Sequence, residues 1–161
     1  MAAPSPRKQL SLDANLLFDL AEERDFAHEF REAFQRRGYR LFLPPTARHE
    51  LHTIWLEGQS SSDRELARVA LVRLRAWGIE PFDLDSAAQG ITEQFARRLA
   101  LDRLIPAEEL NDSLILAETS LAGIPLLVTS DKHLLDIDED ALVLAFNDAD
   151  LPPVRAAHPK R

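Results

Sequence analysis

Apolar positions follow two spacings that alternate along the chain. Short apolar runs of strand length occur at residues 10–12, 39–43, 79–84, 126–129 and 142–146. Between them, apolar residues recur every three to four positions, which predicts helices over about 15–22, 25–37, 62–77 and 86–104 and from Asn111-Asp112 onward. Such alternation of strand and helix favours an α/β fold with a mainly parallel sheet covered by helices on both faces.

Glycine, proline and capping residues place several element boundaries. Gly38 supplies a stop for the helix before it, and Pro44-Pro45 opens the next helix, which carries Glu50. Ser62 and Glu65 form a capping-box pattern for the following helix, which Gly78 ends. These signals support the alternation that the apolar spacing predicts.

The two ends of the chain differ from its middle in composition. Residues 1–7 and 151–161 are rich in Pro, Ala and basic residues and are predicted to be flexible tails. No repeat is visible between them, so residues 8–150 of the 161 are predicted to form a single domain.

Composition narrows the classes of protein that this chain can be. The absence of cysteine excludes a disulfide framework and a thiolate zinc site. No apolar run approaches the length of a membrane span, and the first residues lack the apolar core of a signal peptide, so we expect a soluble cytoplasmic protein. The net charge of −8 argues against tight binding of nucleic acid, although two bound divalent cations would halve it.

Two aspartates follow apolar strands. Asp13 ends the segment before the first helix, and Asp131 follows the run LLVT. Ligands of doubly wound sheets bind at the carboxyl ends of the strands, so both acids are expected to face one crevice. Taken singly, each aspartate has another reading, because an aspartate before a helix commonly caps it.

Two further acids lie on helices with extensive apolar surfaces. Glu50 lies on the shoulder of an apolar face formed by Ala47, Leu51 and Ile54, and Asp112 begins a helix that is apolar almost all round. Asp112 also suits the positive end of a helix dipole. A carboxylate turned toward a core costs several kcal/mol unless it is paired or binds a metal. Both acids therefore need a partner.

The segments that carry these acids, LSLDANLLFDL, LPPTARHEL and LNDSLILAETSLAGIPLLVTSDKHL, resemble the PIN-domain nucleases, which include the VapC-type toxins. The last segment is the most specific, since an acid opening an apolar helix and a T-x-D closing the next strand stand at the family's short separation. The resemblance covers about residues 8–147. It implies a three-layer α/β/α fold in which the central sheet is mainly parallel.

The resemblance also implies a function and a site. Asp13, Glu50, Asp112 and Asp131 match the catalytic acids that hold Mg²⁺ or Mn²⁺, and Asn15 and Thr129 match supporting polar positions. Two such ions can activate a water and stabilise the leaving oxygen of a phosphodiester. The implied activity is an endoribonuclease acting on RNA, the implied partner is a cognate antitoxin, and family members commonly form homodimers.

Basic residues offer further candidate contacts to RNA. Arg64, Arg68 and Arg75 fall on one face of the predicted 62–77 helix, where they form either a phosphate-binding stripe or a solvated face interleaved with acids. Lys132 directly follows Asp131 and either meets substrate or starts the next turn. His49 and His52 flank Glu50 and are expected to project away from it.

Two other classes of function compete with the nuclease. A non-catalytic module that docks RNA or protein would keep the fold, but the presence of all four acids favours catalysis. A small-molecule phosphohydrolase of the haloacid-dehalogenase type would need an aspartate where Asn15 stands. The leading hypothesis is a metal-dependent endoribonuclease, and the binding module is the alternative.

Overall fold

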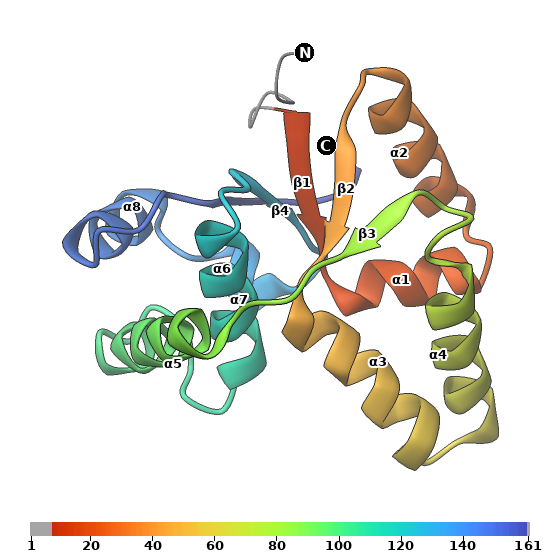
Figure 1. Ribbon diagram of the computed structural model, residues 1–161, viewed down its shortest axis with the longest axis horizontal. Coiled ribbons are helices and arrows are strands. Elements are labelled where there is room, and N and C mark those ends of the chain that lie inside the picture. Colours follow the sequence, from red (N-terminus) through yellow and green to blue (C-terminus); the bar gives the residue numbers. More distant parts are fainter. Residues whose placement is uncertain (1–7, 161) are drawn as a thin grey trace.

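A parallel sheet lies at the centre of the computed structural model, which describes residues 8–160 (Figure 1). Its five strands stand in the order β3-β2-β1-β4-β5, and all the pairings among the described residues are parallel. The strands are β1 (Gln9–Leu12), β2 (Arg40–Leu43), β3 (Ile79–Pro81), β4 (Leu126–Val128) and β5 (Arg155–Ala157). The structure confirms the α/β fold with a mainly parallel sheet.

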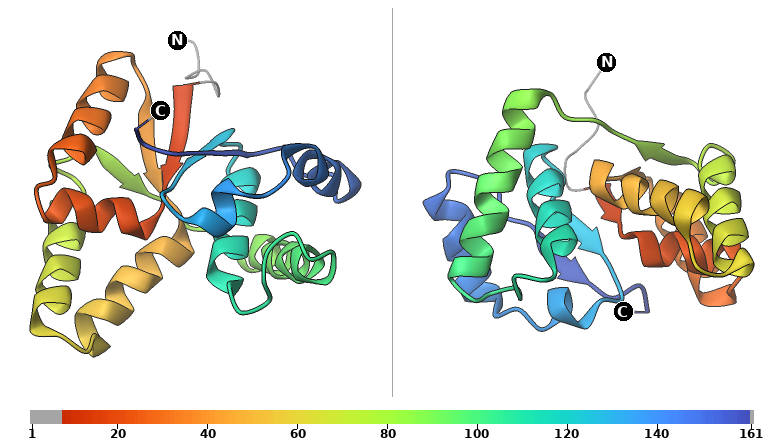
Figure 2. Two further views of the ribbon diagram at one scale, coloured as in Figure 1. Left: turned by 180° about the vertical axis from the view of Figure 1, so that it is seen from behind. Right: turned by 90° about the horizontal axis from the view of Figure 1, so that it is seen from below.

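Helices cover both faces of this sheet. They are α1 (Ala14–Ala21), α2 (Asp25–Arg36), α3 (Pro45–Glu57), α4 (Ser61–Arg73), α5 (Ser86–Leu101), α6 (Leu110–Leu121), α7 (Lys132–Leu135) and α8 (Glu139–Asp148). The helices α1 to α4 lie to one side and α5, α6 and α8 to the other (Figures 1 and 2). This arrangement gives the three layers that the sequence predicts.

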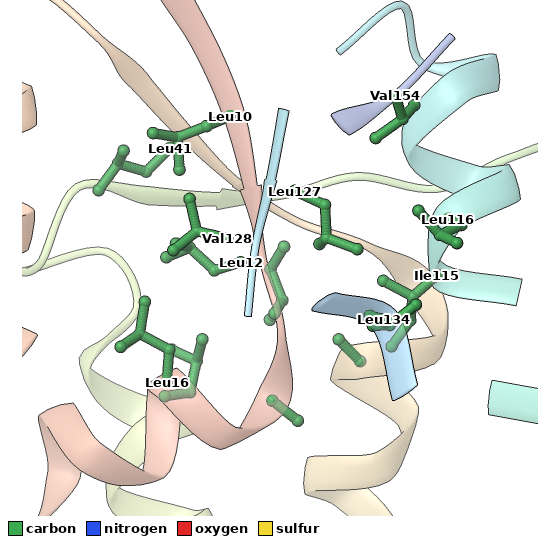
Figure 3. Packing of buried hydrophobic residues seen from close by; sticks show 14 of the residues in the cluster. Leu10, Leu12, Leu16, Leu41, Ile115, Leu116, Leu127, Val128, Leu134 and Val154 are labelled. Atoms are coloured by element: carbon green, nitrogen blue, oxygen red, sulfur yellow. The ribbon is translucent and has the colours of Figure 1, made fainter. Parts of the chain in front are cut away.

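The buried core follows the alternation of side chains along the strands. On β4, Leu127 points toward Leu116 of α6, whereas Val128 points to the opposite face, where Leu16 of α1 lies (Figure 3). Leu10 and Leu12 of β1 are almost completely buried, since β1 is the middle strand of the sheet. Ser11 between them points to the other face and is also fully buried, so both faces of β1 are covered.

The order of the strands determines where a site can lie. The chain leaves β1 toward β2 on one side, and β4 pairs with β1 on the other. The carboxyl ends of β1 and β4 therefore flank the point at which the winding of the sheet reverses, where doubly wound folds bind ligands. Asp13 follows β1 directly, and Thr129 follows β4.

The C-terminal part of the fold differs from the prediction. Residues 142–146, predicted as a strand, belong to α8, whose start is capped by the Asp138 side chain accepting from the Asp140 N–H. The sequence did not predict strand β5, which lies inside the segment 151–161 that was predicted to be a flexible tail. It pairs with β4, and its flanking residues Leu151 and Val154 are buried. The N-terminal tail predicted at 1–7 lies outside the described residues.

Other boundaries are close to the prediction. Gly38 follows α2 with a φ of 87°, a conformation that favours glycine. The cap of α4 is Ser60, whose side chain accepts from the Asp63 N–H, in place of the predicted box at Ser62 and Glu65. None of the helices in the described part of the chain is long and apolar enough to cross a bilayer.

Candidate metal centre

The ends of β1 and β4 form the floor of the candidate site. The Thr129 hydroxyl, completely buried, donates to Asp13 Oδ2 at 2.7 Å and accepts from the Asp131 N–H at 3.0 Å. The Asp13 N–H in turn donates to the Val128 carbonyl oxygen at 3.2 Å. One threonine thus joins the two strand ends and fixes both aspartates relative to each other.

Helices α3 and α6 bring acids to this floor from the side. Asp112, in the first turn of α6, is only 8% exposed, and its Oδ2 is buried without a hydrogen-bond partner among the described residues. Glu50 lies on α3 and is half-buried. A buried carboxylate oxygen without a partner is costly, so its retention indicates a ligand that the protein alone does not supply.

The three aspartates form a compact cluster. Asp13, Asp112 and Asp131 each offer a carboxylate oxygen, and these oxygens lie within 4.8 Å of one another. They line a hollow of about 670 Å³, which we call the acidic hollow; Glu50, Asn15, His49, Asn111, Glu108 and Glu109 also border it. The structure thus brings together all four acids that the sequence singled out. The ends of β1 and β4 form the floor of the hollow, and α3 and α6 form its wall. Glu50 lies on this wall and is not part of the cluster of three aspartates.

Burial and mutual repulsion make three of these four acids hard to ionise. Burial raises the pKa of Glu50 to about 7, helped by the charge of Asp13 and opposed by a side-chain hydrogen bond from Asn111. Burial raises the pKa of Asp112 to about 8, and the charges of Asp131 and Asp13 add to this. Burial also raises the pKa of Asp13, against the hydrogen bond from Thr129. A cation placed among them would reverse these shifts.

The donor set suits a hard divalent cation. Every acid of the cluster offers oxygen, the ligand atom that Mg²⁺ and Mn²⁺ prefer, and the described chain has no cysteine to draw a softer metal. The unpartnered oxygen of Asp112 has a role if it binds such an ion. The alternative role, a helix cap, applies to Asp131, because one of its carboxylate oxygens accepts from the His133 N–H at 2.8 Å at the start of α7. It does not account for Asp13, which makes no side-chain cap bond to α1.

Of the two interpretations of the arginines on this helix, the contacts of Arg64 and Arg68 favour the face interleaved with acids. The Arg64 guanidinium donates to the Gly58 carbonyl oxygen at 2.6 Å, and Arg68 pairs with Glu65 on its own helix at 2.5 Å. Arg75 lies beyond the end of α4, which stops at Arg73. Because Arg64 and Arg68 have partners within the protein, this face is better described as an internally paired surface.

The surroundings of the acids differ in detail from the prediction. Asn15 and His49 both border the acidic hollow, so His49 faces the side of Glu50 and not away from it. Lys132 opens α7 and is exposed, beside a second hollow of about 430 Å³ that also touches Arg155 and His158. Sequence reasoning missed Asn111, although it directly precedes Asp112 and lies on the same helix end.

Comparison with known proteins agrees with this geometry. Residues 10–140 match the PIN domain family. The chain therefore belongs to the PIN domain family, whose members are generally nucleases. No curated protein sequence matches the chain at a significant level.

Solved structures share the fold at low sequence identity. The crystal structure of VapBC2 from Rickettsia felis bound to a DNA fragment from their promoter superposes with a TM-score of 0.63 and 14% identity, covering 93% of this chain and 98% of that one. The crystal structure of FitAcB from Neisseria gonorrhoeae gives a TM-score of 0.52 and 19% identity, covering 94% and 99%. At such identities these likenesses concern the fold.

Proposed function

We propose that this protein is an endoribonuclease that depends on Mg²⁺ or Mn²⁺ and cleaves single-stranded or structured RNA by attack of water on phosphodiesters. The observation that carries the proposal is the cluster of three carboxylates within 4.8 Å, one of which keeps a buried oxygen without a partner. A site built to stabilise the fold alone would pair that oxygen. Membership of a family of nucleases supports the assignment.

The proposed roles follow from position. Asp13, Asp112, Asp131 and Glu50 are the acids that would hold the metal and serve as the catalytic set. The bound ions would supply an activated water and stabilise the charge on the leaving oxygen. Thr129 holds Asp13 and Asp131 in place relative to each other by its two hydrogen bonds. Asn15, which borders the same hollow, is proposed as a supporting polar residue of the site.

Contacts to RNA are proposed on the side of α7. Lys132 lies one residue after Asp131 and borders the second hollow with Arg155 and His158. His158 follows β5, whose carboxyl end lies beside that of β4, since the Thr129 N–H donates to the Ala157 carbonyl oxygen at 2.9 Å. Lys132 and His158 therefore lie at the same edge of the sheet as the acids, where an RNA phosphate next to the cleaved bond would pass.

We further propose that the protein acts in the cytoplasm as the toxin of a toxin–antitoxin pair and forms a homodimer. The VapBC2 and FitAcB structures support a protein antitoxin as partner. The acidic hollow and the low isoelectric point, about 5.1, favour an antitoxin that presents basic side chains to this edge. The alternative is a PIN-like module that binds RNA or protein without cleaving it.

Single-turnover cleavage of a mixed RNA pool distinguishes the two readings. We expect cleavage with Mg²⁺ or Mn²⁺, none with EDTA, and none from the Asp112→Asn variant. Asp63→Asn, which makes the same change at an exposed position of α4, is the matched control and should cleave like wild type. Cleavage that survives EDTA would contradict the metal mechanism, and RNA binding without cleavage under every metal would favour the binding module.

A further inference from the structure

A buried glutamate on α6 holds the start of α3. Glu118 is 6% exposed and lies in the last turn of α6. Its Oε1 accepts from the Thr46 N–H at 3.0 Å, and its Oε2 accepts from the Thr46 hydroxyl at 2.5 Å. Both carboxylate oxygens are thus used on one residue of the neighbouring helix.

The first turn of α3 needs such a partner from elsewhere. The cap position is Pro44, which has no side-chain oxygen, and Pro45 follows it, so α3 makes no side-chain cap bond of its own. The first N–H groups of a helix lack partners within the helix and attract a negative charge. Glu118 supplies both the acceptor and the charge from the adjacent helix.

The same two helices meet a second time at the acidic hollow. Thr46 precedes Glu50 by four residues, so both lie on one face of α3. Asn111, which borders the acidic hollow together with Glu50, precedes Glu118 by seven residues, so both lie on one face of α6. The helices α3 and α6 therefore meet at two places, at the Glu118–Thr46 hydrogen bonds and at the acidic hollow, one turn further along α3.

We infer that Glu118 and Thr46 are positioning residues, which fix α3 against α6 and thereby set the distance from Glu50 to the three aspartates. Glu50 does not belong to the tight group of carboxylates, so its place depends on how α3 sits. A shift at Thr46 is carried to Glu50 along one turn of a rigid helix. This inference rests on the proposed function, because it assigns to Glu50 a role in holding the metal.

The test measures Mn²⁺ affinity by electron paramagnetic resonance of the free ion and the single-turnover rate at saturating RNA. We expect Glu118→Ala to weaken Mn²⁺ binding about tenfold, the usual effect of removing a group that orients a metal ligand, and to slow cleavage. The matched control is Ser120→Ala on the same helix, whose hydroxyl donates to the Pro152 carbonyl oxygen, away from α3. It should leave both quantities unchanged.

Further variants separate positioning from general stability. Glu118→Gln keeps an acceptor for Thr46, so its Mn²⁺ affinity should be closer to wild type than that of Glu118→Ala. In the same way, Thr46→Ser keeps the hydroxyl and should bind Mn²⁺ more tightly than Thr46→Val. In an E50Q background, Glu118→Ala should change Mn²⁺ affinity less than twofold, because the residue that it positions is already altered. Thr46→Val, which keeps the shape of the side chain, carries the test if Glu118→Ala does not fold.

The outcomes are distinguishable. If wild type neither binds Mn²⁺ nor cleaves RNA, the proposed function fails and this inference with it. If wild type does both, and Glu118→Ala or Thr46→Val matches Ser120→Ala in affinity and rate, the positioning role is overturned while the nuclease stands. An equal loss of affinity with and without Glu50 would also overturn it, because the effect would not pass through Glu50.

Discussion

The floor and the wall of the acidic hollow differ in how their acids are satisfied. On the floor, Asp13 accepts from Thr129, and Asp131 accepts from the His133 N–H. On the wall, which α3 and α6 form, the buried Oδ2 of Asp112 has no hydrogen-bond partner among the described residues, and burial raises the pKa of Glu50 to about 7. Hydrogen bonds within the protein partly satisfy the acids of the floor, whereas the acids of the wall would need a bound cation to compensate their burial. Substitutions on the two sides should therefore fail in different ways.

The largest expected effect is on cleavage, from the wall. Asp112→Asn should lower the single-turnover rate about a thousand-fold, or about 4 kcal/mol, because a ligand of the catalytic ions is lost. The fold should persist, since the substitution removes a buried acid that makes no hydrogen bond through Oδ2. Circular dichroism and the cleavage assay check both points. An Asp112→Asn protein that is fully active would show that Asp112 does not hold a catalytic metal.

The next effect is on stability, from the floor. Thr129→Val keeps a β-branched side chain but removes the donor to Asp13 and the acceptor for the Asp131 N–H. We expect a loss of about 2–3 kcal/mol in the free energy of unfolding, measured by urea denaturation. Thr119→Val is the control, because its buried hydroxyl donates only within α6, to the Ile115 carbonyl oxygen. Equal losses would mean that Thr129 has no special role in the floor.

This contrast also marks what the sequence can predict. The strand ends near Asp13 and Asp131 are visible because Asp13 directly follows a short apolar run and Asp131 comes three residues after the end of another. Asp13 and Asp131 lie together because the carboxyl ends of parallel strands share one edge, and α3 and α6 bring Glu50 and Asp112 to the same hollow. The contact of Glu118 with Thr46 joins residues 72 apart in sequence, and no local pattern announces it.

The errors near the C-terminus have a related cause. The run ALVLAF fits a strand or a buried helix equally well, and Asp138, which caps α8, settles the choice. Strand β5 consists of Arg155, Ala156 and Ala157, whose composition is not typical of strands. It forms because it pairs with β4, and pairing of this kind depends on the tertiary structure.

A smaller effect concerns the pH dependence of stability without metal. The folded-state pKa values of Glu50, about 7, and Asp112, about 8, lie above their ordinary values, so the folded protein binds more protons than the unfolded one. The associated stability is complete below about pH 4 and is lost as the pH rises toward 8. Glu50→Gln should recover about 1–2 kcal/mol at pH 8, allowing for solvent screening.

Metal supplies the control for that prediction. Saturating Mg²⁺ should flatten the pH dependence of the melting temperature of wild type, because the cation takes the place of the protons. A metal-free protein whose stability rises between pH 5 and pH 8 would show that these acids are ionised without strain, and the contrast between floor and wall would be lost.

The smallest effect is expected on α4. Arg68→Ala removes an exposed pair with Glu65 and should leave the urea midpoint of unfolding close to that of wild type. Since Arg68 is paired within the protein, we also expect the salt dependence of RNA binding to stay as in wild type. Lys132→Ala should reduce that dependence, because a phosphate contact is lost. A reversed result would restore the arginine stripe as the RNA-binding surface.

The most direct test of the central claim is a titration of Mn²⁺ into wild type and into the Asp13→Asn, Asp112→Asn double variant, followed by electron paramagnetic resonance of the free ion. We predict saturable binding to wild type, accompanied by a rise in melting temperature, and neither in the double variant. Equal binding by both proteins, or the absence of binding to wild type, would contradict the assignment of the acidic hollow as a metal centre.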